Sequence, residues 1–289
     1  ISVGCDNEER ITIRNDGNLP LTVEEITQMV TQPADIIMEF GSLPAPPWVL
    51  DPNQEIDFLV SFGIFSAGKA TMSTAVDKYN INDKETFKID VNGRTIGVFD
   101  FFARVRDNWG SYIDDSEFKP EKFYRYLAEG KYRKNEILNF QNDSDSVQIE
   151  VLDKETKKFI EYKYLHFEDD IQKIVRSYFM NYWIASLAYL RSLDYDSANY
   201  GDLIEIPYFE DNSKFSYQMK FIRKEEIDSK IGRFNSIVLS PLIPEKNKLF
   251  KEEDAVKFWI TDDEKKIPLM LEAKMNFGNF VIEIDDYSN

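Results

Sequence analysis

Short segments in which polar and apolar side chains alternate recur along most of this chain. Alternation with a period of two puts one set of side chains on each face of a β-strand, as expected when one face is buried. The pattern is not that of strands alternating regularly with helices, so it favours an antiparallel meander over parallel βαβ units. The sequence therefore predicts a mainly β protein. We expect strands at residues 9–14, 19–26, 35–40, 56–62, 67–76, 85–91, 94–102, 123–127, 146–152, 158–164, 202–209, 213–222, 234–239, 255–260, 267–274 and 278–284.

Two turn signals refine this expectation. Asn92-Gly93 is typical of a tight β-hairpin, because both residues tolerate positive φ, and it predicts a turn between the strands at 85–91 and 94–102. Asp262-Asp263-Glu264 is interpreted as a polar hairpin turn, because a calcium site would need the spaced acids and the glycine of an EF-hand loop. Trp259, just before that turn, is predicted to be a core residue, and a sugar-stacking platform is the alternative.

One segment departs from the β pattern. Asp169-Asp170-Ile171-Gln172 resembles a helix-capping box, and the stretch from residue 177 to residue 190 carries no charge and has helical spacing. We expect one helix, at about residues 169–193, packed inside a large, curved or open-barrel antiparallel sheet. The helix could simply fill the concave side of the sheet. It could also line a pocket for an apolar ligand, and the candidate ligand-binding residues are then Tyr178, Phe179, Tyr182 and Trp183.

Composition excludes several classes of function. The 289 residues are 43% hydrophobic and include 22 Phe and 15 Tyr, which is sufficient for a sizeable core. The formal net charge is -17, and such a surface repels phosphate backbones, so we expect no nucleic-acid partner. No run of about 18 apolar residues occurs, so we expect no transmembrane helix.

The chain contains a single cysteine, Cys5, and a single histidine, His166. A disulfide, a zinc site built on several Cys or His ligands, and a catalytic pair with two imidazoles are therefore excluded. The common nucleophile, phosphate-loop and dinucleotide motifs are also missing. We predict no catalytic residues, no metal site and no cofactor. Carboxylate pairs such as Glu252-Glu253 leave an unrecognised hydrolase as an alternative, since a glycosidase needs only two acids across a cleft.

The first residues resemble a known domain. The motifs are Gly4-Cys5, Ile11-Thr12-Ile13, Asn15-Asp16-Gly17-Asn18 and Pro20-Leu21-Thr22-Val23, followed by Leu50-Asp51-Pro52 and the strand at 56–62. This pattern resembles part of a Hydin-type (ASH) immunoglobulin-like domain, which implies a β-sandwich segment at residues 1–58 that acts as a spacer or docking module. A lipoprotein processing box around Cys5 is a rival interpretation of Ser2-Val3-Gly4-Cys5.

A second resemblance covers residues 58–289. The motifs are Phe62–Thr71, Gly93–Gly97, Phe99–Tyr112, Glu129–Tyr132, Phe250–Glu253, Trp259–Asp263, Ile267-Pro268 and Glu272–Lys274. They are similar to those of an exported Gram-negative bacterial family known as a domain of unknown function. The resemblance implies a periplasmic or outer-membrane-associated protein whose β domain spans residues 59–289.

Together these observations predict a non-enzymatic cell-envelope protein that binds or carries an apolar or amphiphilic ligand, such as a lipid, or another envelope component. The alternative is a structural or docking protein with an envelope protein as its partner, attached through the N-terminal segment. The unrecognised hydrolase is the second alternative.

Overall fold

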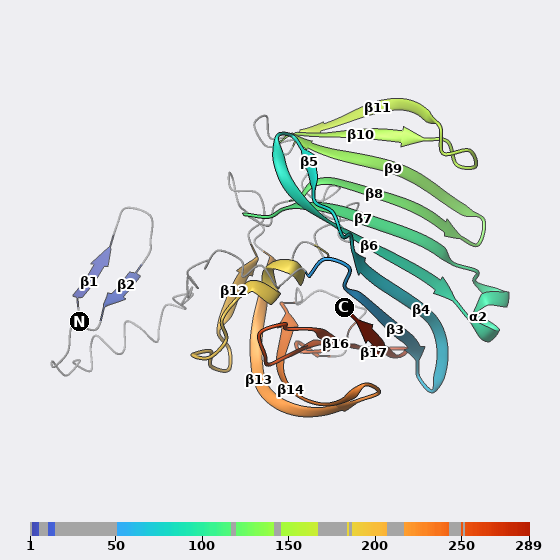
Figure 1. Ribbon diagram of the computed structural model, residues 1–289. Helices are drawn as coiled ribbons and strands as arrows, with labels where there is room; N and C mark the ends of the chain where they lie inside the picture. The colour runs from blue at the N-terminus through green and yellow to red at the C-terminus, as the bar shows by residue number, and fades with distance from the viewer. Residues whose placement is uncertain are drawn as a thin grey trace. The chain divides into compact units, whose positions relative to one another are not determined.

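The computed structural model describes residues 2–5, 11–14, 51–116, 120–141, 146–166, 184, 187–206, 217–242, 250 and 252–289 (Figure 1). Contacts divide the chain into two units, Ile1–Met38 and Glu39–Asn289. In the first unit, β1 (Ser2–Cys5) pairs antiparallel with β2 (Ile11–Arg14). The strand predicted at 9–14 is thus confirmed for residues 11–14, and residues 9 and 10 lie outside the described residues. The strands predicted at 19–26 and 35–40 lie outside the described residues, and the ASH-like sandwich stays a prediction.

The second unit is built on one large antiparallel sheet, as the alternation of side chains predicts. Along the sheet the order is β11-β10-β9-β8-β7-β6-β4-β3-β17-β16-β15-β14-β13-β12, and β5 pairs with β6 beside this path. The strands are β3 (Glu55–Phe62), β4 (Phe65–Thr74), β5 (Tyr79–Ile81), β6 (Lys84–Thr95), β7 (Arg106–Asp114), β8 (Pro120–Glu129), β9 (Tyr132–Gln141), β10 (Ser146–Leu152), β11 (Phe159–His166), β12 (Leu203–Ile206), β13 (Tyr217–Ser229), β14 (Gly232–Pro241), β15 (Val256–Thr261), β16 (Pro268–Met275) and β17 (Gly278–Ser288).

The sheet curves, so that one face of both its halves contributes to a single core (Figure 1). Phe123 and Leu138 come from β8 and β9, whereas Ile237 and Leu239 come from β14, and all four are fully buried in the same cluster. β3 joins the two halves, because it pairs with β4 on one side and with β17 on the other along residues 55–62. The division of the chain at residue 58 stays a prediction.

The described end of the predicted helix lies in this core. Residue 184 and residues 187–192 are helical, so the helix ends within a residue of the predicted position. Ile184, Leu187 and Leu190 are buried against strand residues of the core cluster. A helix packed inside the sheet is therefore confirmed for its C-terminal part.

The hairpin predicted at Asn92-Gly93 is wrong, and so is the strand predicted at 94–102. β6 continues through both residues to Thr95, and residues 97–102 form the short helix α2 (Gly97–Phe102). Gly93 serves close packing instead of a turn, because a Cβ at this position would lie 3.3 Å from the Trp109 ring. The chain turns at Gly97, whose φ of +57° is readily adopted by glycine.

Candidate functional site

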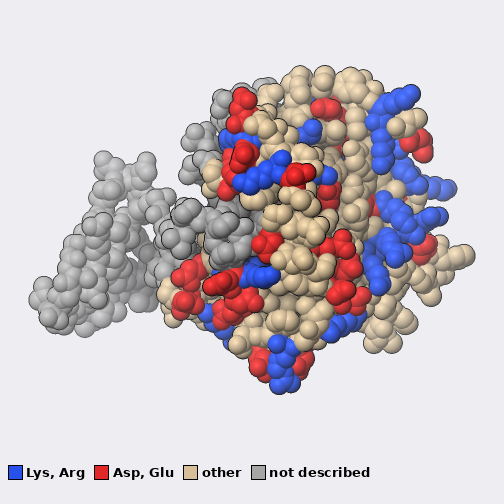
Figure 2. Space-filling model, in the orientation of Figure 1, with Lys and Arg blue, Asp and Glu red and all other residues tan. Residues whose placement is uncertain are grey.

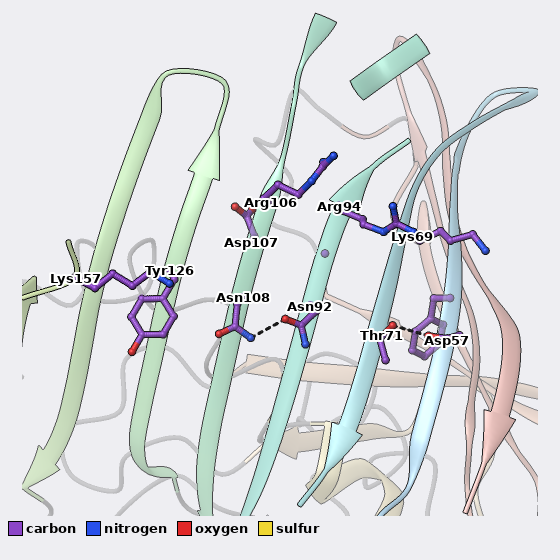
Figure 3. Close-up of a pocket in the computed structure, with 12 residues that line it drawn as sticks. Asp57, Lys69, Thr71, Asn92, Arg94, Arg106, Asp107, Asn108, Tyr126 and Lys157 are labelled. Atoms are coloured by element: carbon purple, nitrogen blue, oxygen red, sulfur yellow. Dashed lines mark hydrogen bonds between the residues drawn. The ribbon is translucent and has the colours of Figure 1, made fainter. Parts of the chain in front are cut away.

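A row of polar side chains crosses the sheet on the face opposite the core. Asp57 on β3 pairs in register with Thr71 on β4, Thr71 with Asn92 on β6, and Asn92 with Asn108 on β7. Tyr126 on β8 ends the row opposite Asn108. The Thr71 hydroxyl donates to Asp57 Oδ1 at 2.5 Å, and Asn108 Nδ2 donates to Asn92 Oδ1 at 2.9 Å (Figure 3). The row therefore contains two hydrogen-bonded pairs of side chains, Asp57 with Thr71 and Asn92 with Asn108.

The period of two explains why these side chains point away from the core. Ile56 and Met72, the neighbours of Asp57 and Thr71 in sequence, are also register partners and are buried, with exposed fractions of 0% and 8%. Successive residues of a strand face opposite sides of the sheet, so fixing Ile56 and Met72 in the core fixes the polar row outside it.

A second row beside the first consists of cations. Lys69, Arg94 and Arg106 are register partners on β4, β6 and β7 (Figure 3). Like charges directly opposite one another across neighbouring strands destabilise a sheet. The three adjacent cations thus carry an electrostatic cost, in a protein whose net charge is -17.

Two of the three cations have counter-charges. Arg106 donates from Nη1 to Asp100 Oδ1 at 2.6 Å and from Nη2 to Asp100 Oδ2 at 3.1 Å. These bonds are the main cause that lowers the pKa of Asp100 to about 2. Lys69 Nζ forms an ion pair with Asp285 Oδ2 at 3.2 Å. Arg94 is exposed and forms no ion pair with any described residue. Its guanidinium is the cation of this row that is available to an anion from solution.

The rows line a groove with a volume of about 500 Å³. Lys157, from the turn between β10 and β11, closes one side, with Nζ 4.2 Å from the centre of the Tyr126 ring. This cation–π contact holds a further positive charge over the groove. The Tyr126 ring supplies the aromatic part of the lining. The groove thus combines cations, amide groups and aromatic surface, which is a set suited to an anionic group attached to an apolar body.

Asp107 is a buried acid that borders the groove, between Arg106 and Asn108 but on the core-facing side of β7. It is 6% exposed, and the backbone N–H of Ala128 donates to its Oδ1 at 2.8 Å. Burial, which disfavours the carboxylate, raises the pKa of Asp107 to about 6. The groove therefore becomes less negative when the pH falls below that value.

The structure describes some of the residues singled out from the sequence and leaves others undescribed. Tyr178, Phe179, Tyr182 and Trp183 lie outside the described residues, so their role in ligand binding stays a prediction. Trp259 is a core residue as expected, and its indole N–H donates to Glu225 Oε1 at 2.8 Å.

The turn predicted at residues 262–264 is confirmed. Asp263 Oδ1 accepts hydrogen bonds from the backbone N–H groups of Lys265 and Lys266, at 2.9 Å and 3.0 Å, as expected for an Asp that stabilises its own turn. His166 is the last residue of β11. Across the described parts of the chain, no cluster of three or more His, Cys, Asp and Glu side chains is placed to hold a metal. No helix in those same parts is long and apolar enough to cross a membrane.

Sequence reasoning did not find the groove. Its signal was present, because Lys69 and Thr71, Asn92 and Arg94, and Arg106 and Asn108 are polar pairs at spacing two on three strands. That these pairs meet depends on the register between strands, which the alternation within one strand does not fix.

The fold and the groove define an open, curved antiparallel β-sheet protein. The chain belongs to the family described as "Protein of unknown function (DUF3108)", whose model matches residues 57–285. The resemblance to a domain-of-unknown-function family is thereby confirmed, whereas no match supports the ASH-like part.

Solved structures with a similar course of the chain are distant in sequence. A β-barrel-like protein of the domain of unknown function DUF1849 from Brucella abortus is 5% identical, with a TM-score of 0.43, and the match covers 82% of this chain and 98% of that one. A candidate exported protein with a YmcC-like fold from Bacteroides fragilis is 7% identical, with a TM-score of 0.34, over 83% of this chain and 99% of that one. No curated protein matches the sequence.

Proposed function

We propose that this protein is a non-enzymatic binding protein of the cell envelope, and that its groove holds the anionic headgroup of an amphiphilic ligand. The observation that carries the proposal is the row of Lys69, Arg94 and Arg106. Placing three cations side by side costs stability, and sites that break a local rule of stability in this way are commonly functional. An anion that binds between Arg94 and its neighbours relieves this repulsion.

The rest of the groove supports an amphiphile over a small inorganic anion. A volume of about 500 Å³ is much larger than a phosphate or sulfate group requires, and lies within the usual range of ligand pockets. The Tyr126 ring offers aromatic surface next to the cations. Asn92 and Asn108 offer amide groups that suit the polar atoms of a headgroup.

The envelope location and the absence of catalysis are parts of the same proposal. The location rests on the sequence resemblance to an exported bacterial family. The non-enzymatic role is supported by the composition of the groove, since its acids Asp57 and Asp107 each accept a hydrogen bond from the protein and no Ser, Cys or His lines it. The hydroxyl in the described lining, that of Thr71, donates to the Asp57 carboxylate, and no imidazole stands beside it as a base.

Calorimetry with soluble short-chain lipids tests the proposal. Dihexanoyl phosphatidylglycerol, which is anionic, is expected to bind, and dihexanoyl phosphatidylcholine, which is zwitterionic, to bind about tenfold more weakly. Arg94→Gln is expected to lower the affinity for the anionic lipid about tenfold, the loss expected of one charge-assisted contact.

Lys163→Gln is the matched control. Lys163 is an exposed cation on β11 that pairs with Glu161 and does not line the groove. Its removal changes the net charge by the same amount as Arg94→Gln and should leave the affinity unchanged. Equal losses in both variants would mean that only overall charge matters, and the groove would not be the site. Release of fatty acid or glycerol from the bound lipid would contradict the non-enzymatic role.

A further inference from the structure

An exposed apolar rim lies at one end of the sheet, next to the groove. The hairpin turn between β3 and β4, the helix α2 and the turn between β16 and β17 all lie at this end, because Ile96 N donates to Ala67 O and Gly63 N donates to Asn279 O. Each of these segments exposes large apolar side chains. We call them the rim: Ile64 (92% exposed), Phe65 (62%), Val98 (69%), Phe101 (85%), Phe102 (78%) and Phe277 (64%).

The helix α2 is held in place although it buries none of its residues. Asp100 accepts two hydrogen bonds from Arg106 and one from the Thr95 hydroxyl, at 2.8 Å. The same hydroxyl accepts from the Val105 N–H at 3.0 Å. A short helix has little stability of its own, and its usual stabilisation is the burial of an apolar face. Here polar contacts fix a helix whose apolar side chains point into solvent, so the apolar side chains are positioned for a contact outside this unit.

Cations surround the rim. Arg104 follows α2 and is exposed, and its carbonyl accepts a hydrogen bond from Gly130 N, which places the turn between β8 and β9 beside it. That turn contributes the exposed Lys131, and the groove contributes Lys69 and Arg94. Figure 2 shows Lys and Arg side chains gathered along the side of the molecule where Figure 1 places α2 and the β3–β4 turn. Cationic side chains thus gather at this end, although the net charge of the chain is -17.

We propose that the rim docks on an anionic lipid surface, with the aromatic side chains of α2 inserted at the level of the headgroups and the surrounding cations facing lipid phosphates. Exposed Phe side chains beside Lys and Arg are the combination that binds such surfaces, and each cation near the surface strengthens binding about fivefold. An apolar patch for a protein partner would not require the cations beside it. The inference rests on α2 and Arg104, which do not line the groove, although the groove cations Lys69 and Arg94 lie next to the rim.

Flotation with lipid vesicles tests the inference. The full chain is expected to float with vesicles of phosphatidylglycerol and phosphatidylethanolamine in equal parts, and to float far less with phosphatidylcholine vesicles. The double variant Phe101→Ser/Phe102→Ser is expected to lower the bound fraction at least tenfold, because it removes the two most exposed rings of α2. Since α2 buries nothing, the variant should fold, and an unchanged thermal unfolding curve verifies this.

Two further variants test whether binding depends on the apolar side chains of the rim in particular, and whether it depends on the cations beside them. Val76→Ser/Tyr200→Ser removes two apolar side chains, 64% and 71% exposed, that lie outside the rim, and should bind vesicles as the unmodified protein does. Arg104→Glu should weaken binding to anionic vesicles, and high salt should weaken it too.

The inference is overturned if the unmodified protein does not float, or if the α2 variant floats equally well. It is also overturned if the unmodified protein is a dimer that this variant separates, because the rim would then be a contact between two copies. Retained binding of soluble dihexanoyl phosphatidylglycerol by the α2 variant would show that the groove works without the rim.

Discussion

Arg191, on the core helix, donates a hydrogen bond from Nη1 to Gln54 Oε1 at 3.0 Å, just before β3 begins. Its Nη2 donates to the carbonyl of Lys265, in the turn between β15 and β16, at 3.0 Å. One guanidinium thus ties the helix to two distant parts of the sheet. Arg191 is only 1% exposed, and burial lowers its pKa to about 10.

Replacing Arg191 by leucine is expected to lower the free energy of unfolding by about 3 kcal/mol, because it leaves the buried Gln54 side chain and the Lys265 carbonyl without their donor. Gln54→Leu removes only one of these contacts, and about 1–2 kcal/mol is expected for it. Urea denaturation measures both losses. An equal loss in the two variants would show that the contact to Lys265 contributes nothing.

Lys84 forms ion pairs with two buried carboxylates, whereas Arg191 donates to uncharged groups. Lys84 Nζ lies 2.8 Å from Glu121 Oε1 and 3.4 Å from Asp114 Oδ2. The side chains of Glu121 and Asp114 are 1% and 4% exposed. Burial acts to lower the pKa of Lys84, but its contacts with Glu121 and Asp114 outweigh burial and raise it. Lys84→Met should therefore cost about 3 kcal/mol at neutral pH, because two buried carboxylates lose their common cation.

Lys78→Met is the control for this prediction. Lys78 is exposed to a similar degree, 44% against 36% for Lys84, but its partners Glu85 and Asp115 are 67% and 27% exposed, so at most about 1 kcal/mol is expected. Thermal and urea unfolding of both variants provide the comparison. Equal losses in the two variants would contradict the explanation by buried carboxylates.

Much of this fold was predictable from alternation within single strands. β10 has the bounds that residues 146–152 predict, because apolar and polar residues alternate cleanly there. β9 was missed, since Asn135 and Glu136 are polar and yet buried, so its pattern is not that of a half-buried strand. β7 was missed as well, because Asp107 and Ser111 interrupt its core-facing side in the same way.

The groove and the rim could not be predicted from the alternation within single strands. The row from Asp57 to Tyr126 joins residues that are far apart in the chain, and only the register between five strands brings them together. The rim depends on α2, where the glycine at 97 turns the chain and residues of strand-forming type become helical because Asp100 and Arg106 hold the turn.

Gly110 on β7 lies beneath the ring of Tyr124, its register partner on β8. A Cβ at Gly110 would overlap the Tyr124 ring, so Gly110→Ala is expected to lower the free energy of unfolding by about 1–3 kcal/mol. The double variant Gly110→Ala/Tyr124→Ala should show no additional cost of the alanine, which a double-mutant cycle measures. An additive cycle would show that the ring is not the cause.

The raised pKa of Asp107 makes the free energy of unfolding depend on pH. Its pKa of about 6 in the folded protein lies above the value of about 4 in an unfolded chain, so the folded state binds more protons between these values. The contribution of Asp107 to the free energy of unfolding therefore falls as the pH rises from about 4 to about 6, and stays low above that. Asp107→Asn removes this dependence. At neutral pH the variant should be more stable than the unmodified protein by up to about 3 kcal/mol, and in acid the two should converge.

The same ionisation should regulate ligand binding. Because Asp107 borders the groove as the neighbour of Arg106 in sequence, its protonation removes a negative charge beside the groove, and dihexanoyl phosphatidylglycerol should bind several-fold more tightly at pH values below about 6 than above. The phosphodiester keeps its charge over this range, so the change belongs to the protein. Calorimetry across the range should give a flat profile for Asp107→Asn. A profile that stays as steep in this variant as in the unmodified protein would assign the dependence to another group and leave Asp107 without a part in binding.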